Sequence, residues 1–356
     1  EYLYIQQQPK VDKGEFNNRF ESLAENSFSL SFPTFCNGYA GTNWFFKFLN
    51  IDGTLKDEDV DLLCYRDEDL KNISLEMLKS GNYDFLHGAI GIAYYLLYNN
   101  GNKLDEEYFA TFFILLNALS ARSTQGIMIP TYDFKINNIK PDEINFGLSH
   151  GIPSILKFCL QCYKHMVCKK ESKELANRII EYIISNPNDD ITHCYFPYHV
   201  TLGKDAEKRT RLAWCYGDLG VSIVLYQAAS LFQEKKWMDL ALHVLLDSTK
   251  RRTHDQTMIV DGSLCHGTAG AAHIYNKMWH YTQNAVFKDA SDYWIQKTLE
   301  LSVYSDGIGG YKKFSGYTKS YENDPGLLEG TAGIGLALLS YLTGDFSWDY
   351  TLMLND

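Results

Sequence analysis

The sequence lacks three features that would place it in or beyond a membrane. No apolar run approaches the roughly 18 to 20 residues needed to span a bilayer. The segment Glu1–Gln8 has no basic residue and no signal-peptide pattern. The eight cysteines do not form a short, evenly spaced disulfide framework. We therefore expect a cytoplasmic protein whose thiols are reduced and available as metal ligands.

Positive charge and strand-forming segments are also scarce. The chain has 33 basic against 44 acidic residues and a formal charge of -11, which argues against nucleic acid or an anionic membrane as its main partner. Only Gly126–Pro130 and Ile191–Pro197 have the composition of short strands. Since 45% of the residues are hydrophobic, the chain can still build a large core.

One short pattern recurs six times along the chain. We call each copy a glycine frame: Gly-x-x-Gly with the two residues before it, followed by an apolar run. The first glycines are Gly38, Gly88, Gly151, Gly217, Gly267 and Gly330, at intervals of 50, 63, 66, 50 and 63 residues. The third copy has Ser154 in place of the second glycine, although Pro153 suits a first helical turn. The period predicts one repetitive architecture.

The segments between the frames have helical periodicity. Four are amphipathic, namely Glu106–Leu119, Glu174–Ile184, Trp237–Leu246 and Ala290–Leu301. Three runs just after frames are apolar nearly all round and predict buried helices, namely Ile92–Leu97, Val221–Tyr226 and Ile334–Tyr341. Six hairpins of one amphipathic and one buried helix predict an all-α fold, an (α/α)6 toroid. We expect a single domain over residues 1–356 without an inserted second domain, because the longest interval exceeds the shortest by only 16 residues.

Cys215, Cys265 and His266 are the candidate metal ligands. They belong to the fourth and fifth frames, Cys215-Tyr-Gly and Cys265-His-Gly. Two thiolates and one imidazole with an open fourth position are a ligand set of catalytic zinc. A ring of repeats brings neighbouring frames together although 50 residues separate the two cysteines. The alternative is that these are buried thiols and a core histidine.

Two other groups of cysteine and histidine are weaker candidates. Cys159, Cys162, His165 and Cys168 are three residues apart, so on a helix they drift by about 60° at each step and cannot converge. We interpret them as core or interface thiols. His193, Cys194 and His199 lie close together among aromatic residues, and ordinary packing explains them.

Four further residues are candidates for the chemistry around the metal. Asp84 and His150 lie at the entrances to the second and third repeats, while Arg211 and Tyr216 flank Cys215. A cation and a tyrosine can stabilise developing negative charge, and a histidine and a carboxylate can move protons. The alternatives are that Arg211 is a surface charge and that Asp84 only caps a helix.

The motifs Arg-Leu-Ala-Trp-Cys-Tyr-Gly217 and Leu-Cys-His-Gly-Thr-Ala-Gly270 closely resemble the lanthionine synthetase C family, the cyclases of lanthipeptide biosynthesis. The likeness covers nearly the whole chain. It implies an (α/α)6 toroid with one zinc bound by Cys215, Cys265 and His266, and with water or a substrate cysteine at the fourth position. It also implies catalytic positions for His150, Arg211, Tyr216 and Asp84, with His150 as the first choice for moving the proton.

The reaction that this resemblance implies is a Michael-type addition. A cysteine thiol of a dehydrated precursor peptide adds to dehydroalanine or dehydrobutyrine and closes a (methyl)lanthionine ring. The implied partners are a dehydratase and an exporter, in a complex that would bring this cytoplasmic protein to the membrane periphery. One alternative is a non-cyclising relative that binds glutathione or another thiol. Others are a scaffold protein with a structural zinc site and a glycoside-processing enzyme that uses Asp218, Glu329 and Asp324.

Overall fold

The computed structural model describes residues 2–7, 14–98, 104–123, 126–134, 136–188, 194–204 and 209–356. They form two compact units. Unit 1 comprises residues 1–119, 132–139 and 161–172, and unit 2 comprises residues 120–131, 140–160 and 173–356. Within the described ranges, no helix has both the length and the apolar character needed to cross a membrane. The single domain over residues 1–356 stays a prediction.

Unit 1 is helical, with a core between short helices. Its helices are α1 (Tyr2–Gln7), α2 (Gly14–Ser27), α3 (Tyr39–Ile51), α4 (Asp57–Leu63), α5 (Asp67–Lys79), α6 (Ala89–Leu97) and α7 (Glu106–Ala118). Helix α3 packs on α4 and α6, and α5 packs on α6 and α7. Phe46, Val60 and Cys64 are buried together, with Phe20 of α2 packed against them.

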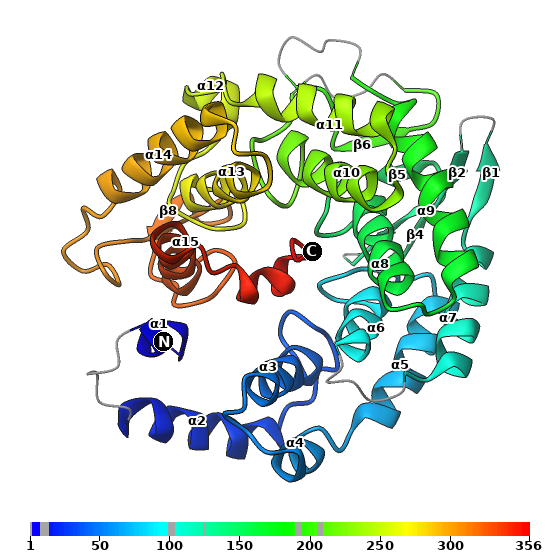
Figure 1. Cartoon of the computed structure of the whole chain (residues 1–356), viewed down its shortest axis with the longest axis horizontal. Helices are drawn as coiled ribbons and strands as arrows, with labels where there is room; N and C mark the ends of the chain where they lie inside the picture. The colour runs from blue at the N-terminus through cyan, green and yellow to red at the C-terminus, as the bar shows by residue number, and fades with distance from the viewer. Residues whose placement is uncertain are drawn as a thin grey trace. The chain divides into compact units, whose positions relative to one another are not determined.

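Unit 2 contains the longer hairpins. Its helices are α10 (Asp218–Phe232), α11 (Lys235–Ser248), α12 (His254–Thr257), α13 (Thr268–Thr282), α14 (Ala285–Glu300), α15 (Thr331–Thr343) and the 3-10 helix η1 (Ser347–Leu352). Helices α10 and α13 pack against each other, and each forms a hairpin with the helix that follows it. Figure 1 shows α11 and α14 on the outer side of this pair. Two further helices, α8 (Ile152–Lys164) and α9 (Lys169–Ile184), contribute residues to both units.

Every glycine frame begins a helix at the same point. Helices α3, α6, α8, α10, α13 and α15 all start at the residue after the first glycine of a frame. The second glycine lets the helix backbone pack on the loop of its own frame, because a Cβ at Gly270 would lie 1.9 Å from the carbonyl oxygen of Leu264. Gly217 has a positive φ of 85°, which other residues rarely adopt. The helices predicted just after the frames therefore start inside the frames.

Four frames share a side-chain turn six residues before the first glycine. There, an asparagine or aspartate oxygen accepts a hydrogen bond from the backbone N–H two residues later, which is an Asx turn. The four acceptors, with distances of 3.3, 2.7, 3.0 and 2.6 Å, are Asn82, Asn145, Asp261 and Asp324. The fourth frame has Arg211 at this position. The frame that carries Cys215 therefore departs from the local pattern.

Burial confirms two of the three helices that were predicted to be buried and corrects the third. All nine residues of α6 are buried. In α10, Asp218–Leu225 are buried throughout. In α15, only four residues are buried, and Leu342 is 78% exposed. Apolar composition around a helix does not ensure burial, because apolar atoms form much of any protein surface.

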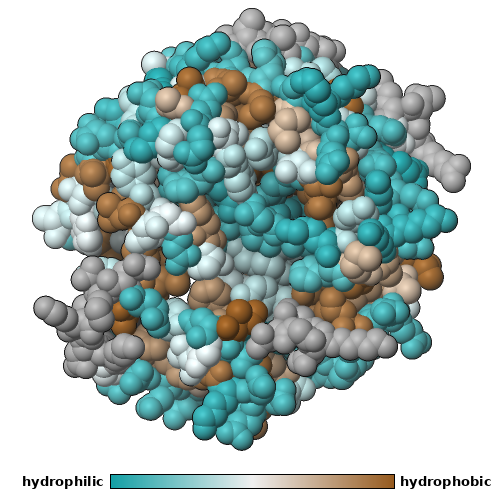
Figure 2. Space-filling model, viewed as in Figure 1, coloured by the Kyte–Doolittle hydropathy of each residue, from teal (hydrophilic) through white to brown (hydrophobic). Residues whose placement is uncertain are grey.

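The strands form four two-stranded sheets. They are β1 (Ala121–Ser123) with β2 (Gly126–Met128), β3 (Thr131–Asp133) with β4 (Asn138–Lys140), β5 (Glu143–Asn145) with β6 (His199–Thr201), and β7 (Lys313–Ser315) with β8 (Ser320–Glu322). Strand β2 confirms the prediction for Gly126–Pro130. The prediction for Ile191–Pro197 is wrong in its described part, residues 194–197, because the N–H groups of Tyr195 and Phe196 donate to a carboxylate of α10 instead of to a strand. Figure 2 shows a face that is mainly hydrophilic, with hydrophobic residues in separate patches.

Candidate metal centre

Backbone hydrogen bonds align the neighbouring frames of unit 2. The residue two positions before each first glycine donates its N–H to the carbonyl oxygen of the equivalent residue in the next frame. Ser149 donates to Cys215 at 3.4 Å, Cys215 to Cys265 at 3.4 Å, and Cys265 to Leu328 at 2.7 Å. Equivalent positions therefore lie side by side, which is why Cys215 and Cys265 meet.

The ligand atoms of Cys215, Cys265 and His266 all lie within 4.8 Å of one another. Cys215 is buried and the other two are half-buried. Tetrahedral zinc with sulfur at about 2.3 Å holds its ligands about 3.8 Å apart, so small side-chain movements would complete the site. No other group of three or more histidine, cysteine or carboxylate side chains meets in this way in the part of the chain that the structure describes. The three residues fit a zinc ion with one open position.

The electrostatics of the cluster favour negative charge on sulfur. The hydrogen bond from Cys265, the hydrogen bond from His266 and the charge of Arg211 lower the pKa of Cys215 to about 5, against the effect of burial. The Cys215 thiolate in turn raises the pKa of Cys265. Burial opposes the charge of His266, but the hydrogen bond to Cys215 raises the pKa of that imidazole. Both thiols also precede helix N-termini, which favour thiolates.

Tyr216 follows Cys215 in the chain, and His150 follows Ser149, whose N–H donates to the Cys215 carbonyl oxygen. Their rings are 6.3 Å apart between centroids. The Tyr216 hydroxyl accepts a hydrogen bond of 3.0 Å from the side-chain amide of Asn145. A Cβ at Gly147 would be 2.6 Å from the Tyr216 ring, so only glycine leaves room for this tyrosine. The third and fourth frames thus hold the two predicted catalytic side chains together.

Arg211 is fixed through its backbone. Its N–H donates to the hydroxyl of Tyr198 at 2.9 Å. The Tyr198 ring stands edge-on to that of Tyr216, 5.3 Å away. Arg211 is half-buried, and its charge lowers the pKa of Cys215. Arg211 is therefore not a plain surface charge, as the alternative interpretation had it, because it is half-buried and its charge acts on Cys215.

A buried ion pair supports the segment before Arg211. Arg251 and Asp218 are 3.2 Å apart, with side chains 9% and 4% exposed. Arg251 also donates to the carbonyl oxygen of Thr210, the residue before Arg211. Asp218 accepts hydrogen bonds from the backbone N–H groups of Tyr195 and Phe196. The pair therefore attaches two loops to the start of α10.

Sequence reasoning did not identify Arg251 or Tyr198 as residues of this region. Arg251 is one basic residue in the run Lys250-Arg-Arg252, and Tyr198 is one of 25 tyrosines. Asn145 does carry a signal, since it occupies the Asx position of its frame. Comparing that position across the frames groups Asn145 with three residues of the same pattern, and it sets apart Arg211 and Phe32 of the first frame.

Asp84 belongs to unit 1. It is 1% exposed, and its carboxylate accepts a hydrogen bond of 2.7 Å from the N–H of His87. No side chain caps the start of α6, whose N-cap residue is Gly88, so Asp84 shapes the loop before the helix. Its relation to the metal ligands stays a prediction.

The weaker cysteine groups have ordinary environments. Cys159 and Cys162 are fully buried in α8, as expected for core thiols. The sulfur of Cys194 accepts a hydrogen bond of 3.2 Å from the N–H of Thr210. His193 lies outside the described residues.

The three carboxylates that a glycoside-processing enzyme would need all form ion pairs. Asp218 pairs with Arg251, while Asp324 and Glu329 both pair with Lys313, at 2.8 and 2.9 Å. Lys313 also lowers the pKa of Asp324. Burial raises the pKa of Asp218 to about 6, as the acid of such an enzyme requires, but this side chain is 4% exposed and paired with Arg251, so it is not accessible to a sugar. This arrangement does not favour that chemistry.

Comparison with known proteins identifies relatives of this chain. The model of the lanthionine synthetase C-like protein family matches residues 17–353. The nisin biosynthesis protein NisC of Lactococcus lactis subsp. lactis is 23% identical over an alignment of 313 residues, and the match covers 81% of this chain and 68% of that protein. A solved nisin cyclase is similar with a TM-score of 0.75 at 19% identity, over 99% of this chain and 88% of that one. This likeness confirms the predicted fold class, an all-α α/α toroid.

Proposed function

The chain belongs to the lanthionine synthetase C-like family, and from this premise we propose that it is a zinc-dependent lanthipeptide cyclase. The main support for the proposal is that the ligand atoms of Cys215, Cys265 and His266 lie within 4.8 Å of one another. The substrate would be a dehydrated precursor peptide, as the likeness to a nisin cyclase suggests. A dehydratase must act first, because the reaction consumes dehydroalanine or dehydrobutyrine.

Cys215, Cys265 and His266 would hold the zinc ion. When bound, it would supply a lowered pKa for a peptide thiol, so that thiolate is present at neutral pH. The thiolate sulfur attacks the β-carbon of the dehydroamino acid. The carbon–sulfur bond forms as the carbon–carbon π bond breaks, and its electron pair moves to the carbonyl oxygen as an enolate.

Arg211 and Tyr216 would stabilise the negative charge that develops, as preorganised donors do in other enzymes. His150 accepts the proton of the peptide thiol and returns it to the α-carbon of the enolate. The proton that leaves the thiol therefore ends on the α-carbon, and the reaction needs no other proton or electron donor. Asp84 is the remaining family position, and we propose that it assists this proton transfer.

The test is a cyclisation assay. A synthetic peptide with one cysteine and one dehydroalanine is incubated with the purified full chain, and the product is treated with N-ethylmaleimide. Ring closure leaves the peptide mass unchanged but removes the thiol, so the ring product gains no maleimide. If all of the peptide still reacts with N-ethylmaleimide, the chain is not a cyclase of this peptide, and the result favours a thiol-binding relative. Zinc content alone would not distinguish a cyclase from such a relative.

The control variant is His150→Ala. It should retain zinc and fold while cyclisation falls by roughly 10²- to 10⁴-fold, the usual contribution of general acid–base catalysis. Unchanged cyclisation in this variant would remove His150 from the mechanism. We also propose that a dehydratase and an exporter associate with this protein, which co-purification from cells that make the peptide would test.

A further inference from the structure

The side chain of Asn145, the last residue of β5, joins the third frame to Tyr216. Asn145 is 5% exposed. Its Oδ1 atom accepts a hydrogen bond of 2.7 Å from the N–H of Gly147, and its Nδ2 atom donates one of 3.0 Å to the hydroxyl of Tyr216. A backbone N–H can only donate, so the side-chain oxygen must face Gly147 and the amide nitrogen must face Tyr216. The fold therefore sets the orientation of this amide.

This orientation decides the direction of the Tyr216 hydroxyl. An amide nitrogen donates and does not accept, so the phenol oxygen is the acceptor of this bond and its own proton points away from Asn145. A hydrogen bond that the oxygen receives also makes the O–H a better donor, because linked hydrogen bonds polarise one another. Asn145 therefore prepares Tyr216 to donate its proton.

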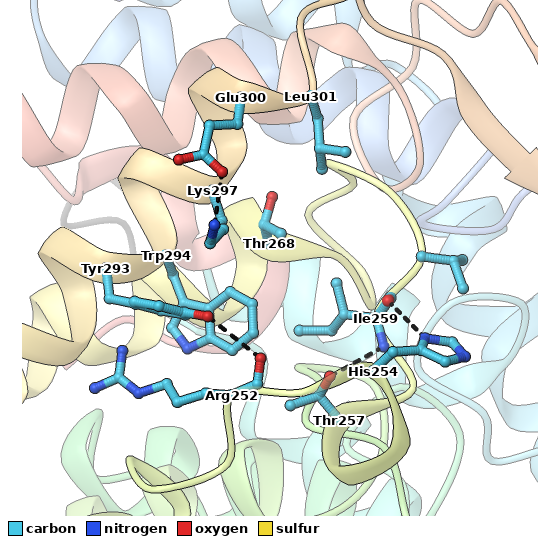
Figure 3. A pocket seen from close by; sticks show the side chains of 11 residues that line it. Arg252, His254, Thr257, Ile259, Thr268, Tyr293, Trp294, Lys297, Glu300 and Leu301 are labelled. Carbon is cyan, nitrogen blue, oxygen red and sulfur yellow. Dashed lines mark hydrogen bonds and ion pairs between the residues drawn. The ribbon is translucent and has the colours of Figure 1, made fainter.

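Two other tyrosine hydroxyls of unit 2 give their protons to acceptors in the protein. The Tyr293 hydroxyl, in the wall of a cavity of about 370 Å³ between α12 and α14, donates to the carbonyl oxygen of Arg252 at 3.3 Å (Figure 3). The Tyr341 hydroxyl donates to the carboxylate of Asp292 at 2.7 Å. These bonds use the proton to hold the fold together. In the bond at Tyr216, the hydroxyl oxygen is instead the acceptor.

Tyr216 occupies the frame position of a metal ligand. It directly precedes the first glycine of the fourth frame, as His266 does in the fifth. The N–H of Cys215 donates to the carbonyl oxygen of Cys265 at 3.4 Å, so these two frames run side by side. Tyr216 is half-buried, which leaves part of its side chain accessible to a bound peptide. A donor at this position belongs to the surroundings of the metal site.

The pairing of β5 with β6 holds this arrangement rigid. Asn145 pairs with His199 in the ladder, and the ring of Tyr198 stands edge-on to that of Tyr216, 5.3 Å away. A Cβ at Gly151 would lie 2.2 Å from the carbonyl oxygen of Asn145, so the third frame closes tightly on this residue. A donor that is fixed in this way needs no reorganisation when charge develops on a substrate.

We propose that Asn145 is a positioning residue for cyclisation. It turns the Tyr216 hydroxyl so that the proton is donated to the carbonyl oxygen of the dehydroamino acid, where the negative charge of the enolate develops. Asn145 acts through Tyr216 and does not touch the substrate. This inference rests on the proposed cyclase function.

The variant Asn145→Asp keeps the turn and reverses the bond to Tyr216. One carboxylate oxygen can still accept the N–H of Gly147, as Asp261 and Asp324 do at the same position of their frames, so the variant should fold with a nearly unchanged melting temperature. The other oxygen can only accept, so Tyr216 would donate to it and not to the substrate. We expect kcat to fall roughly 10²-fold with KM within about twofold, close to the effect of Tyr216→Phe, since both changes remove the same preorganised donor.

A double-mutant cycle shows whether Asn145 acts through Tyr216. If it does, Asn145→Asp should cause no further loss in a Tyr216→Phe background, so the double variant should keep the activity of Tyr216→Phe within about twofold. A second loss of roughly 10²-fold in that background would overturn the inference, because the new charge would then act without the tyrosine hydroxyl. An unchanged kcat in Asn145→Asp would overturn it as well.

The matched control is Asn284→Asp. The Oδ1 atom of Asn284 accepts a hydrogen bond of 3.0 Å from the N–H of Val286, which is the same turn that Asn145 makes. Asn284 follows the C-terminal end of α13, whose 15 residues span about 22 Å. At that distance solvent screens the added charge, so kcat and KM should stay within about twofold. A loss equal to that of Asn145→Asp would overturn the inference, since added charge alone would explain it.

A spectroscopic measurement separates this inference from the cyclase proposal. In protein labelled with ¹³C at the tyrosine Cζ atoms, the Tyr216 resonance is assigned by its absence from Tyr216→Phe. Donation to a carboxylate deshields this carbon, so the resonance should move downfield in Asn145→Asp and stay in place in Asn284→Asp. This shift supports the positioning of Tyr216 by Asn145 even if the cyclisation assay fails. An unmoved resonance overturns the inference even if the chain is a cyclase.

Discussion

At the residue scale, Arg211 stands where four other frames have asparagine or aspartate. Those residues close an Asx turn by accepting an N–H, which an arginine cannot do. Instead, the charge of Arg211 acts on Cys215. The first frame departs as well, with Phe32, so it is the effect of Arg211 on Cys215, and not the missing turn alone, that indicates a functional position.

We predict that Arg211→Asn separates fold from activity. Asparagine occupies the same position in the second and third frames, so the variant should fold with an unchanged melting temperature and retain zinc. Cyclisation should fall by roughly 10²- to 10³-fold, the cost of removing one preorganised donor. Full activity in the N-ethylmaleimide assay would contradict a role for the guanidinium.

Titration of the thiols tests the electrostatics of the metal-free centre. Because the folded pKa of Cys215 is about 5 and its ordinary value is 9.0, its thiolate should persist from alkaline pH down to about pH 5 and disappear below it. Thiolate ultraviolet absorbance of zinc-stripped protein measures this. In Cys265→Ala, which removes the largest cause of the shift, the midpoint should move up toward 9. An unshifted midpoint would show that Cys265 does not stabilise the thiolate.

The sequence predicted that Cys215, Cys265 and His266 meet, because two frames repeat one pattern and place cysteine at the same position. That they bind zinc stays a prediction. It could not predict Tyr198 and Arg251, whose contacts depend on tertiary structure. Tyr198 reaches the site because β6 pairs with β5, and strands of three residues have too little periodicity to be recognised. Arg251 looks like a surface charge until its pairing with buried Asp218 is known.

At the element scale, the glycine frames act as helix starts that need a close backbone approach. We predict that Gly270→Ala destabilises the protein by about 1 kcal/mol or more, because the new Cβ would meet the Leu264 carbonyl at 1.9 Å. Zinc binding should weaken as well, since Leu264 precedes Cys265. Chemical denaturation and a competitive zinc chelator measure the two effects.

The control is Gly335→Ala in α15, where a Cβ would meet nothing within 4 Å. This change should stabilise the protein by about 0.5 to 1 kcal/mol, because alanine favours a helix interior over glycine. If both glycine variants behaved alike, the close approach at the frame would not be the reason for its glycine.

The sequence predicted the helices better than the small sheets. The apolar runs Ile92–Leu97 and Val221–Tyr226 predicted α6 and α10, which begin three residues earlier, at Ala89 and Asp218. The hairpin β7–β8 was not predicted, and the strand expected at Ile191–Pro197 does not form in residues 194–197. Its N–H groups bond to Asp218 instead, a contact that no local pattern indicates.

At the scale of the whole molecule, the C-terminal segment binds the buried helices of unit 2. The indole N–H of Trp214 donates to the carbonyl oxygen of Leu352 at 2.7 Å. Lys277 and Asp349 form an ion pair of 2.7 Å, with side chains 4% and 0% exposed. In Figure 1 the C-terminus lies beside α10. The segment therefore completes the core around the fourth and fifth repeats.

We predict that Asp349→Ala lowers the free energy of unfolding by about 3 to 5 kcal/mol, because Lys277 would be left as an unpaired buried charge. The control is Asp247→Ala, which removes an exposed pair with Lys250 and should cost at most about 1 kcal/mol. Urea denaturation measures both. Equal effects would show that the Lys277–Asp349 pair does not stabilise the fold.

The six-fold repeat was sufficient to predict the α/α toroid class, because six helical hairpins that recur every 50 to 66 residues permit few other architectures. It carried no information on the cavity between α12 and α14. That cavity depends on how Trp294 and Arg252 pack, which no spacing of residues in the sequence indicates.

Zinc reconstitution tests the central claim most directly. Zinc-stripped protein is titrated with zinc, and the initial rate of thiol loss from the dehydroalanine peptide is measured at each addition. Our account predicts a linear rise that ends at about one equivalent, and no recovery in Cys265→Ala, which removes one of the three ligands. Full cyclisation by the metal-free protein would contradict it.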